Sequence, residues 1–172
     1  GEEPYSLAML FTEEGLSERV HILGTDISRR SLERAQKAQY GEWSLRGDGA
    51  AVARKYLRRE DEKYHVIQTI RSRVQFEYLN LALDVYPSSV TGTRDLDLIL
   101  CRNVLIYFDQ ATKADILNRM SEVMSDQGAL FLGGAESVLG ISNSFKPFTG
   151  LRGAYAVSRV ASAAAGTARA SA

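Results

Sequence analysis

The stretch CRNVLIYFD, residues 101–109, decides the fold because polar side chains interrupt its apolar run at a single point. The residues before it, Leu96–Leu100, have the apolar content of a short strand buried on both faces, which belongs at the centre of a sheet. Arg102 and Asn103 follow where that strand should end. Ligands bind just beyond the carboxyl ends of the strands in open α/β sheets. These two side chains are therefore candidates for a binding site.

Strands and helices alternate on both sides of this stretch. Val20–Gly24 has the composition of a buried strand, and Ser28 can cap the helix that follows. Val74–Leu79 and Ala129–Leu132 are predicted as further strands, and Asp109 can cap the helix between them. Such alternation is typical of a parallel sheet with helices on both faces. The sequence therefore predicts the α/β class.

Two segments depart from the alternation. Residues 41–73 are punctuated by glycine, crowded with charge and β-type in part, which predicts an inserted β-subdomain. Residues 161–172 contain only Ala, Ser, Gly, Thr and one arginine, so they are expected to be disordered. The main domain would then comprise residues 1–40 and 74–160. Its closing segments, 145–148 and 154–157, are predicted as an antiparallel pair.

Composition limits the possible functions. Of 172 residues, 45% are hydrophobic and 24% are charged, as in an ordinary globular domain. Lys+Arg and Asp+Glu both number 21, so no net charge favours nucleic acid, and no apolar stretch has the length that membrane insertion needs. The single cysteine, Cys101, is expected to be buried, which favours a reducing cytoplasm. One cysteine and two separated histidines predict no metal site.

Polar residues at the strand ends leave alternatives open. Asp26 follows a strand and precedes a helix, where an acid can accept ribose hydroxyls or can cap the helix. Asn80 and Leu81 could frame an adenine ring, although a turn asparagine is the simpler interpretation. Glu2 and Glu3 are expected at the start of a helix, where an acid can have no function beyond balancing the helix dipole.

Arg102 and Tyr107 have similar alternatives. A buried guanidinium at Arg102 would need partners, which a cofactor or substrate carboxylate could supply. A structural Arg–carboxylate pair would also satisfy it. Tyr107 lies in an apolar run and could be a core residue, but a buried hydroxyl would still need a partner.

Three motifs together resemble the CheR-type chemotaxis receptor methyltransferases. They are the quoted stretch, GEEPYS at residues 1–6 and GTDI at residues 24–27, and the resemblance runs from Gly1 to about Arg159. It implies a Rossmann-like, S-adenosylmethionine (SAM)-dependent methyltransferase fold with a small inserted β-subdomain. It also implies methyl transfer from SAM to receptor glutamates, which gives glutamate methyl esters and S-adenosylhomocysteine.

The resemblance assigns roles to the candidate residues. Asp26 would bind the ribose, and Glu3, with Glu2 in reserve, would approach the amino acid end of the cofactor. Tyr107 would lie beside the transferred methyl and, with Arg102, would be catalytic. The cofactor-binding set implied is Glu3, Asp26, Asn80, Leu81, Arg102 and Asn103. Asp26, Asn80, Arg102 and Asn103 are then expected to share one pocket.

The chain departs from the family in two places. The family's first strand and helical N-terminal domain would precede Gly1, so the first strand is expected to be missing and this fragment alone could be inactive. The expected partner is the cytoplasmic helical bundle of a chemoreceptor. Residues 58–63 contain no glycine, unlike the loop with which some members bind a receptor C-terminal peptide, so no dependence on that tethering peptide is expected.

Other functions remain open from the sequence. One alternative is a catalytically inactive relative that senses SAM or binds a partner. Another is a methyltransferase acting on a small molecule or nucleic acid, which the balanced charge disfavours. The basic residues between Arg54 and Arg73 could steer an acidic receptor or could form an ordinary solvated face.

Overall fold

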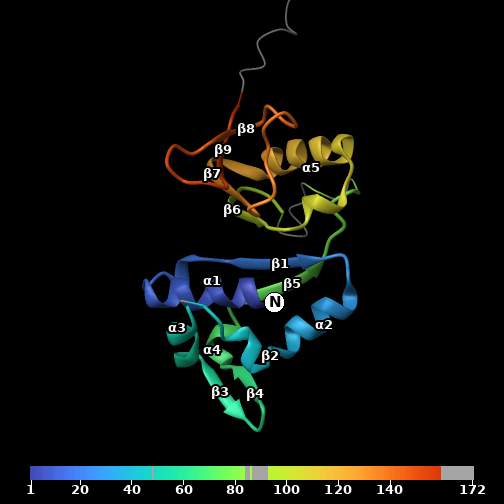
Figure 1. Cartoon of the computed structure of the whole chain (residues 1–172). Coiled ribbons are helices and arrows are strands. Elements are labelled where there is room, and N and C mark those ends of the chain that lie inside the picture. The colour runs from blue at the N-terminus through green and yellow to red at the C-terminus, as the bar shows by residue number, and fades with distance from the viewer. Residues whose placement is uncertain (48, 84–85, 87–92, 160–172) are drawn as a thin grey trace, which may run out of the picture. The chain divides into compact units, whose positions relative to one another are not determined.

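The computed structural model describes residues 1–47, 49–83, 86 and 93–159, which form two compact units (Figure 1). Unit 1 comprises Gly1–Asn80 and unit 2 comprises Leu81–Ala172. The described strands form sheets that each belong to one unit. The division into residues 1–40 with 74–160, 41–73 and 161–172 stays a prediction, and the last of these segments lies outside the described residues.

Unit 1 contains a parallel strand pair and a small antiparallel sheet. Strands β1 and β5 are parallel neighbours, in register from Ile22 opposite Val74 to Asp26 opposite Tyr78. Strands β2, β4 and β3 form the antiparallel sheet in that order. In chain order the elements are α1 (Glu2–Glu13), η1 (Ser17–Arg19), β1 (Ile22–Asp26), α2 (Arg29–Lys37), β2 (Gln39–Tyr40), η2 (Glu42–Ser44), α3 (Ala50–Lys55), β3 (Leu57–Glu60), β4 (Lys63–Val66), α4 (Gln68–Arg71) and β5 (Val74–Tyr78).

The predicted start of α2 is confirmed. The Ser28 hydroxyl accepts the backbone N–H of Ser31, which satisfies one of the amides that a helix leaves open at its first turn. The helix ends at Ala38, whose left-handed backbone (φ 53°) turns the chain into β2. Leu32 and Ala35 form its buried side. The turn between β1 and α2 is therefore fixed by side-chain and backbone hydrogen bonds.

The core of unit 1 lies where α1 packs along β1 and β5. Its buried members are Tyr5, Ala8, Met9, Ala38, Val66, Ile70 and Val74. Tyr5 also donates its hydroxyl to the carbonyl oxygen of Ala35 over 3.1 Å, so this large side chain is buried without losing its hydrogen bond. Because Val66 and Ile70 belong to the same cluster, the inserted segment shares the core of the strand pair.

Unit 2 carries a four-stranded mixed sheet. Its strand order is β6-β7-β9-β8, in which β6 and β7 are parallel and the other neighbours are antiparallel. The predicted antiparallel pair near the end of the chain is thus confirmed. In chain order the elements are β6 (Leu96–Cys101), η3 (Leu105–Tyr107), α5 (Gln110–Val123), β7 (Met124–Leu132), β8 (Phe145–Pro147) and β9 (Ala154–Val157).

Helix α5 and strand β7 supply much of the unit 2 core. Ile116 and Leu117 on α5 and Leu130 on β7 have no exposed surface. Each such side chain contributes about 1.5–3 kcal/mol relative to an exposed position. Asp109 caps α5 as predicted, because its carboxylate accepts the backbone N–H of Thr112 over 2.9 Å.

Strand β6 lies at the edge of the four-stranded sheet of unit 2, and its side chains are mostly half-buried. The expectation that Leu96–Leu100 lies at the centre of a sheet stays a prediction. Within unit 2, β6 pairs in parallel with β7, and no described strand of that unit pairs with the other edge of β6. Apolar composition alone does not distinguish a central strand from an edge strand covered on its faces. The mixed α/β class is confirmed.

Candidate functional site

In unit 1 the carboxyl ends of β1 and β5 bring two predicted residues together. Asp26 is the last residue of β1 and pairs with Tyr78, the last of β5. The backbone N–H of Leu79 then donates to the carbonyl oxygen of Asp26 over 3.2 Å. Asn80 follows directly and is half-buried. The structure therefore places Asp26 and Asn80 at the same edge of this strand pair.

Asp26 has capacity left for a ligand. Its side chain is exposed, and one oxygen accepts the backbone N–H of Ser28 over 2.7 Å. Since Ser28 is the N-cap of α2, Asp26 does not hold that position. An ionised carboxylate offers about four acceptor sites, so one backbone bond leaves room for the two hydroxyls of a ribose.

The first turn of α1 lies close to the end of β1. A Cβ added to Gly24 would lie 3.1 Å from the Pro4 ring, so glycine allows the helix start to approach the strand. Glu3 in this turn is half-buried, whereas Glu2 is exposed and accepts a hydrogen bond from the Ser44 hydroxyl. This contact holds Glu2 toward η2, and Glu3 stays the predicted ligand.

In unit 2 the predicted residues lie on the loop after β6. Cys101 is buried at the end of the strand, and Arg102 and Asn103 are exposed. The expectation of a buried guanidinium at Arg102 is therefore wrong: the strand ends at Cys101, and the next side chain is exposed to solvent. Asn103 has a left-handed backbone (φ 59°), a conformation in which asparagine is enriched.

Tyr107 is not a core residue. Its side chain is 81% exposed, whereas Leu105, two residues earlier, is 2% exposed and anchors the η3 turn. Burying Leu105 turns the hydroxyl-bearing ring outward on the same short element. Leu81, the remaining predicted residue, is half-buried, and its carbonyl oxygen accepts the Tyr86 hydroxyl over 2.9 Å. The Tyr107 ring is thus exposed to solvent.

Sequence reasoning missed one residue beside this loop. Glu136 lies after β7, and its carboxylate accepts backbone N–H groups of the loop after β6. The available signal was an acid shortly after Gly133-Gly134 at the end of a predicted strand. Nothing in that pattern says that the acid would bind the backbone of a neighbouring loop, because the partners are more than thirty positions away in the chain.

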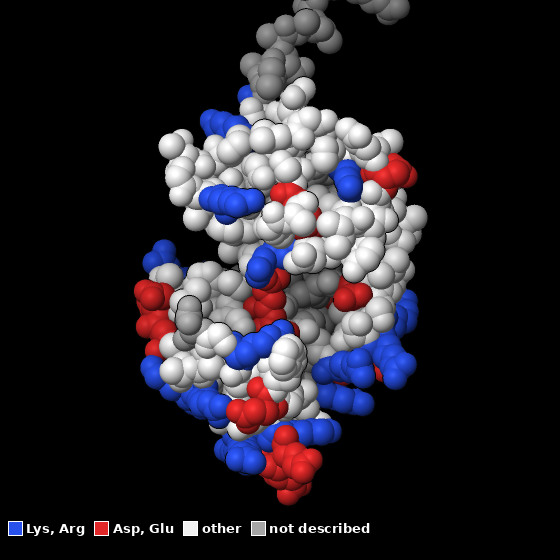
Figure 2. Space-filling view, viewed as in Figure 1, with Lys and Arg blue, Asp and Glu red and all other residues white. Residues whose placement is uncertain are grey.

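The basic cluster of unit 1 is partly neutralised. Arg54 pairs with Glu42 over 2.7 Å, Lys55 pairs with Glu13 over 2.6 Å, and Arg73 pairs with Glu18. Figure 2 shows Lys and Arg side chains on the surface of unit 1 with Asp and Glu among them. These pairs favour the interpretation of a solvated face that links elements of the unit.

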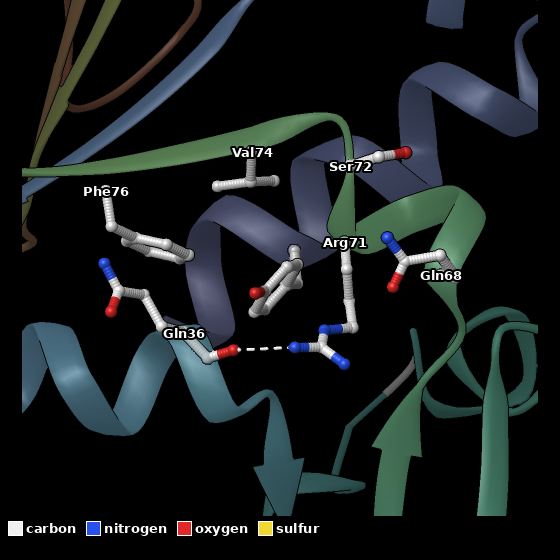
Figure 3. A pocket seen from close by; sticks show the side chains of 7 residues that line it. Gln36, Gln68, Arg71, Ser72, Val74 and Phe76 are labelled. Carbon is white, nitrogen blue, oxygen red and sulfur yellow. Dashed lines mark hydrogen bonds between the residues drawn. The ribbon is translucent and has the colours of Figure 1, made fainter.

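A separate hollow of about 230 Å³ opens in unit 1 beside α2, α4 and β5 (Figure 3). Its lining residues are Tyr5, Gln36, Gln68, Arg71, Ser72, Val74 and Phe76. The Arg71 guanidinium donates to the carbonyl oxygen of Gln36 over 3.1 Å, which ties α4 to the end of α2. No residue predicted for the site lines this hollow.

The described residues contain neither a metal-binding cluster nor a membrane span. No three His, Cys, Asp or Glu side chains there are grouped as a metal ion would require. Within the same residues, no helix combines the length and the apolar character needed to cross a membrane.

Comparison with known proteins extends over almost all of the described chain. The family model for the CheR methyltransferase SAM-binding domain matches residues 1–153. A probable biofilm formation methyltransferase, WspC, of Pseudomonas aeruginosa is 35% identical over 148 residues, which are 86% of this chain and 34% of that protein. Chemotaxis protein methyltransferases of Borreliella burgdorferi and Vibrio parahaemolyticus are 34% and 36% identical, over 83% and 85% of this chain.

The chain spans only part of these relatives. It covers 34% of the Pseudomonas protein, 51% of the Borreliella protein and 54% of the Vibrio protein. The family match nevertheless includes both groups of strand-end residues, Asp26 with Asn80 and Arg102 with Asn103. This chain belongs to the CheR methyltransferase family and corresponds to its SAM-binding domain.

Proposed function

We propose that this domain binds SAM and serves a protein-glutamate O-methyltransferase that acts on methyl-accepting chemotaxis receptors. The observation that carries the proposal is the family match over residues 1–153, which contains every residue predicted for the site. The names of the Borreliella and Vibrio relatives point to methylation in chemotaxis. The glutamate side chain as acceptor is our own, finer inference.

Each unit contributes side chains whose chemistry suits one part of the cofactor. Asp26 offers unused acceptor sites for the ribose, and Asn80 at the same edge offers an amide for the adenine. Glu3 in the first turn of α1 would take the amino group of the methionine part. In unit 2, Arg102 and Asn103 are exposed on the loop after β6 and would take its carboxylate. Leu81 would pack against the adenine.

The mechanism needs no general base. A glutamate carboxylate is ionised near neutral pH, since its ordinary pKa lies well below neutrality. SAM, when bound, supplies a methyl group that passes to a carboxylate oxygen while its bond to sulfur breaks and the electron pair stays on sulfur, which leaves S-adenosylhomocysteine. The Tyr107 hydroxyl would orient the acceptor glutamate. Arg102 would donate hydrogen bonds to the acceptor carboxylate in place of the water molecules that it loses on binding.

The partner follows from the same proposal. The acceptor would be a glutamate on the cytoplasmic helical bundle of a chemoreceptor, so the enzyme would be cytoplasmic. Esterification removes the negative charge of that glutamate, which would change how the helices of the bundle pack. Strands β3 and β4 are joined by a turn at Asp61 and Glu62, with Asp61 left-handed (φ 55°), so no longer loop is present there to hold a tethering peptide. We therefore propose that methylation does not depend on such a peptide.

Labelled methyl transfer tests the proposal directly. The full-length protein would be mixed with SAM carrying a labelled methyl group and with receptor cytoplasmic fragments. Base-labile label on receptor glutamates is the expected result. SAM binding in calorimetry without any transfer would instead support an inactive, cofactor-sensing relative. Absence of SAM binding by the full-length protein would overturn the proposal, and tight binding of a receptor C-terminal peptide would overturn the part about tethering.

A further inference from the structure

The Glu136 carboxylate binds four backbone N–H groups on two neighbouring loops. One oxygen accepts from Asn103 and Gly133 over 2.7 Å each, and the other accepts from Val104 over 2.9 Å and Leu105 over 2.7 Å. Such a carboxylate is saturated, because two oxygens hold about four acceptor sites. Bonds from N–H groups to an ionised acceptor are about twice as strong as neutral ones.

Strand register explains why one side chain reaches both loops. Cys101 at the end of β6 is opposite Leu132 at the end of β7, so the two parallel strands end side by side. Gly133 therefore lies next to the loop that begins at Arg102. The backbone N–H of Glu136 donates to the carbonyl oxygen of Gly133 over 2.9 Å, and this turn carries the carboxylate back to the strand ends.

The loop after β6 depends on such an acceptor. Asn103 is left-handed and Val104 is right-handed helical, and alternation of this kind points successive N–H groups at one spot. Three adjacent amides, from Asn103 to Leu105, converge there. Left without a partner, the partly buried N–H groups of Val104 and Leu105 would destabilise this loop conformation. Glu136 therefore decides whether this conformation persists.

We propose that Glu136 is a positioning residue for the SAM site. Its carboxylate holds Asn103 in the left-handed conformation, which sets the directions of the Arg102 and Asn103 side chains on the loop. It touches neither cofactor nor substrate, since its acceptor sites are filled by the backbone. This inference rests on the proposed function, because Arg102 and Asn103 matter only if they bind the cofactor.

The test compares three variants of the full-length protein. Glu136→Gln keeps the shape but turns one acceptor oxygen into an amide donor that faces two N–H groups. Glu136→Asp keeps the charge on a shorter stem. Glu122→Gln is the matched control, because Glu122 is an exposed acid on α5 of the same unit. Calorimetry gives SAM affinity, and hydrogen–deuterium exchange of peptides covering residues 101–109 and 129–137 reports the loops themselves.

Glu136→Gln is expected to weaken SAM binding by about tenfold or more, equivalent to about 1.4 kcal/mol. Hydrogen–deuterium exchange should become faster in the peptides covering residues 101–109 and 129–137 and should stay unchanged in α5. A general loss of stability would instead raise exchange in α5 as well. Glu136→Asp should recover part of both effects, and it keeps the test valid if Glu136→Gln does not fold. Glu122→Gln should match the wild type.

The outcomes separate this inference from the proposed function. If wild-type protein binds SAM but Glu136→Gln binds it equally well, the positioning role is overturned and the proposed function stands. Unchanged exchange in residues 101–109 would also overturn the role. If the wild type binds no SAM, the proposed function fails and this inference fails with it.

Discussion

The main-chain N–H of Leu79 is hydrogen-bonded to the carbonyl oxygen of Asp26, 3.2 Å away. This bond extends the pairing of β1 with β5 by one residue beyond the strands. Asp26 and Asn80 are thereby fixed to each other by backbone and do not depend on a mobile loop. Sites built on such elements hold their geometry better than sites on loops. The unit 1 part of the proposed site should therefore be preformed before the cofactor binds.

Replacing Asp26 by asparagine should weaken SAM binding. The amide side chain of Asp26→Asn would keep one oxygen for the Ser28 N–H but would lose the charge and an acceptor for the ribose. Hydrogen bonds to charged groups are worth about 1.5–3 kcal/mol, so affinity should fall by at least about tenfold. Calorimetry on the full-length protein measures this. Glu33→Gln, at an exposed acid on α2, is the control, and equal losses in both variants would contradict the ribose role.

Two substitutions at Asn103 separate its side chain from its backbone. Asn103→Gly keeps the left-handed conformation available, whereas Asn103→Ala strains it by about 1 kcal/mol. Both should lose SAM affinity if the amide contacts the cofactor, but only the alanine variant should also lose stability in chemical denaturation. If Asn103→Gly binds SAM normally, the side chain has no part in binding.

Tyr107→Phe should reduce turnover without reducing stability. Tyr107 is 81% exposed, and surface substitutions of this kind change stability by less than about 0.5 kcal/mol. The lost hydroxyl should lower kcat for methyl transfer while the affinity for SAM stays unchanged. Steady-state kinetics and a thermal unfolding scan of the full-length protein check both parts. A normal kcat would remove Tyr107 from the catalytic set.

Local signals in the sequence predicted much of the fold. Ser28 and Asp109 cap helices as expected, because capping depends on a residue and the amides three positions later. The antiparallel pair of β8 and β9 was also predicted, since its strands lie close together in the chain. The pairing of β6 with β7 was not predictable from local signals, because the two strands are separated in the chain by helix α5.

The candidate site was predicted less completely for the same reason. Strand ends indicated Asp26 and Arg102, but the exposure of Arg102 depends on the residue at which β6 stops. The local pattern around Glu136 did not reveal its role, because its partners Asn103 and Leu105 are more than thirty positions away. The roles of the predicted residues in catalysis and cofactor binding stay predictions until the variants are measured.

Unfolding at low pH should reveal the network around Glu42. The Tyr64 hydroxyl donates to Glu42 over 2.5 Å and Arg54 donates over 2.7 Å, and these hydrogen bonds lower the pKa of Glu42 below its ordinary value of 4.5. The folded state therefore binds fewer protons at this site than the unfolded state near that pH, so the stabilisation is complete above pH 4.5 and is lost as the pH falls through the lowered pKa.

The measurement compares wild type with Glu42→Gln over a range of pH. Above the ordinary pKa of the carboxyl the wild type should unfold at the higher temperature, and the difference should shrink as the solution becomes more acidic. Glu14→Gln, at an exposed acid just after α1, serves as the control. A difference that stays constant down to acidic pH would show that the charge of Glu42 does not stabilise unit 1.

The adjacent glycines Gly133 and Gly134 differ in how much space surrounds them. A Cβ on Gly133 would lie 2.7 Å from a Glu136 carboxylate oxygen and 2.9 Å from the Asn103 backbone nitrogen, whereas a Cβ on Gly134 would meet nothing within 4 Å. Overpacking of this kind costs about 1–3 kcal/mol. Gly133→Ala should therefore lower the free energy of unfolding by that amount and weaken SAM binding, because the Asn103 backbone must move. Gly134→Ala should leave the free energy of unfolding unchanged in chemical denaturation and the SAM affinity unchanged in calorimetry. Equal behaviour of the two variants would mean that the close approach of Gly133 to the loop after β6 is not required for binding.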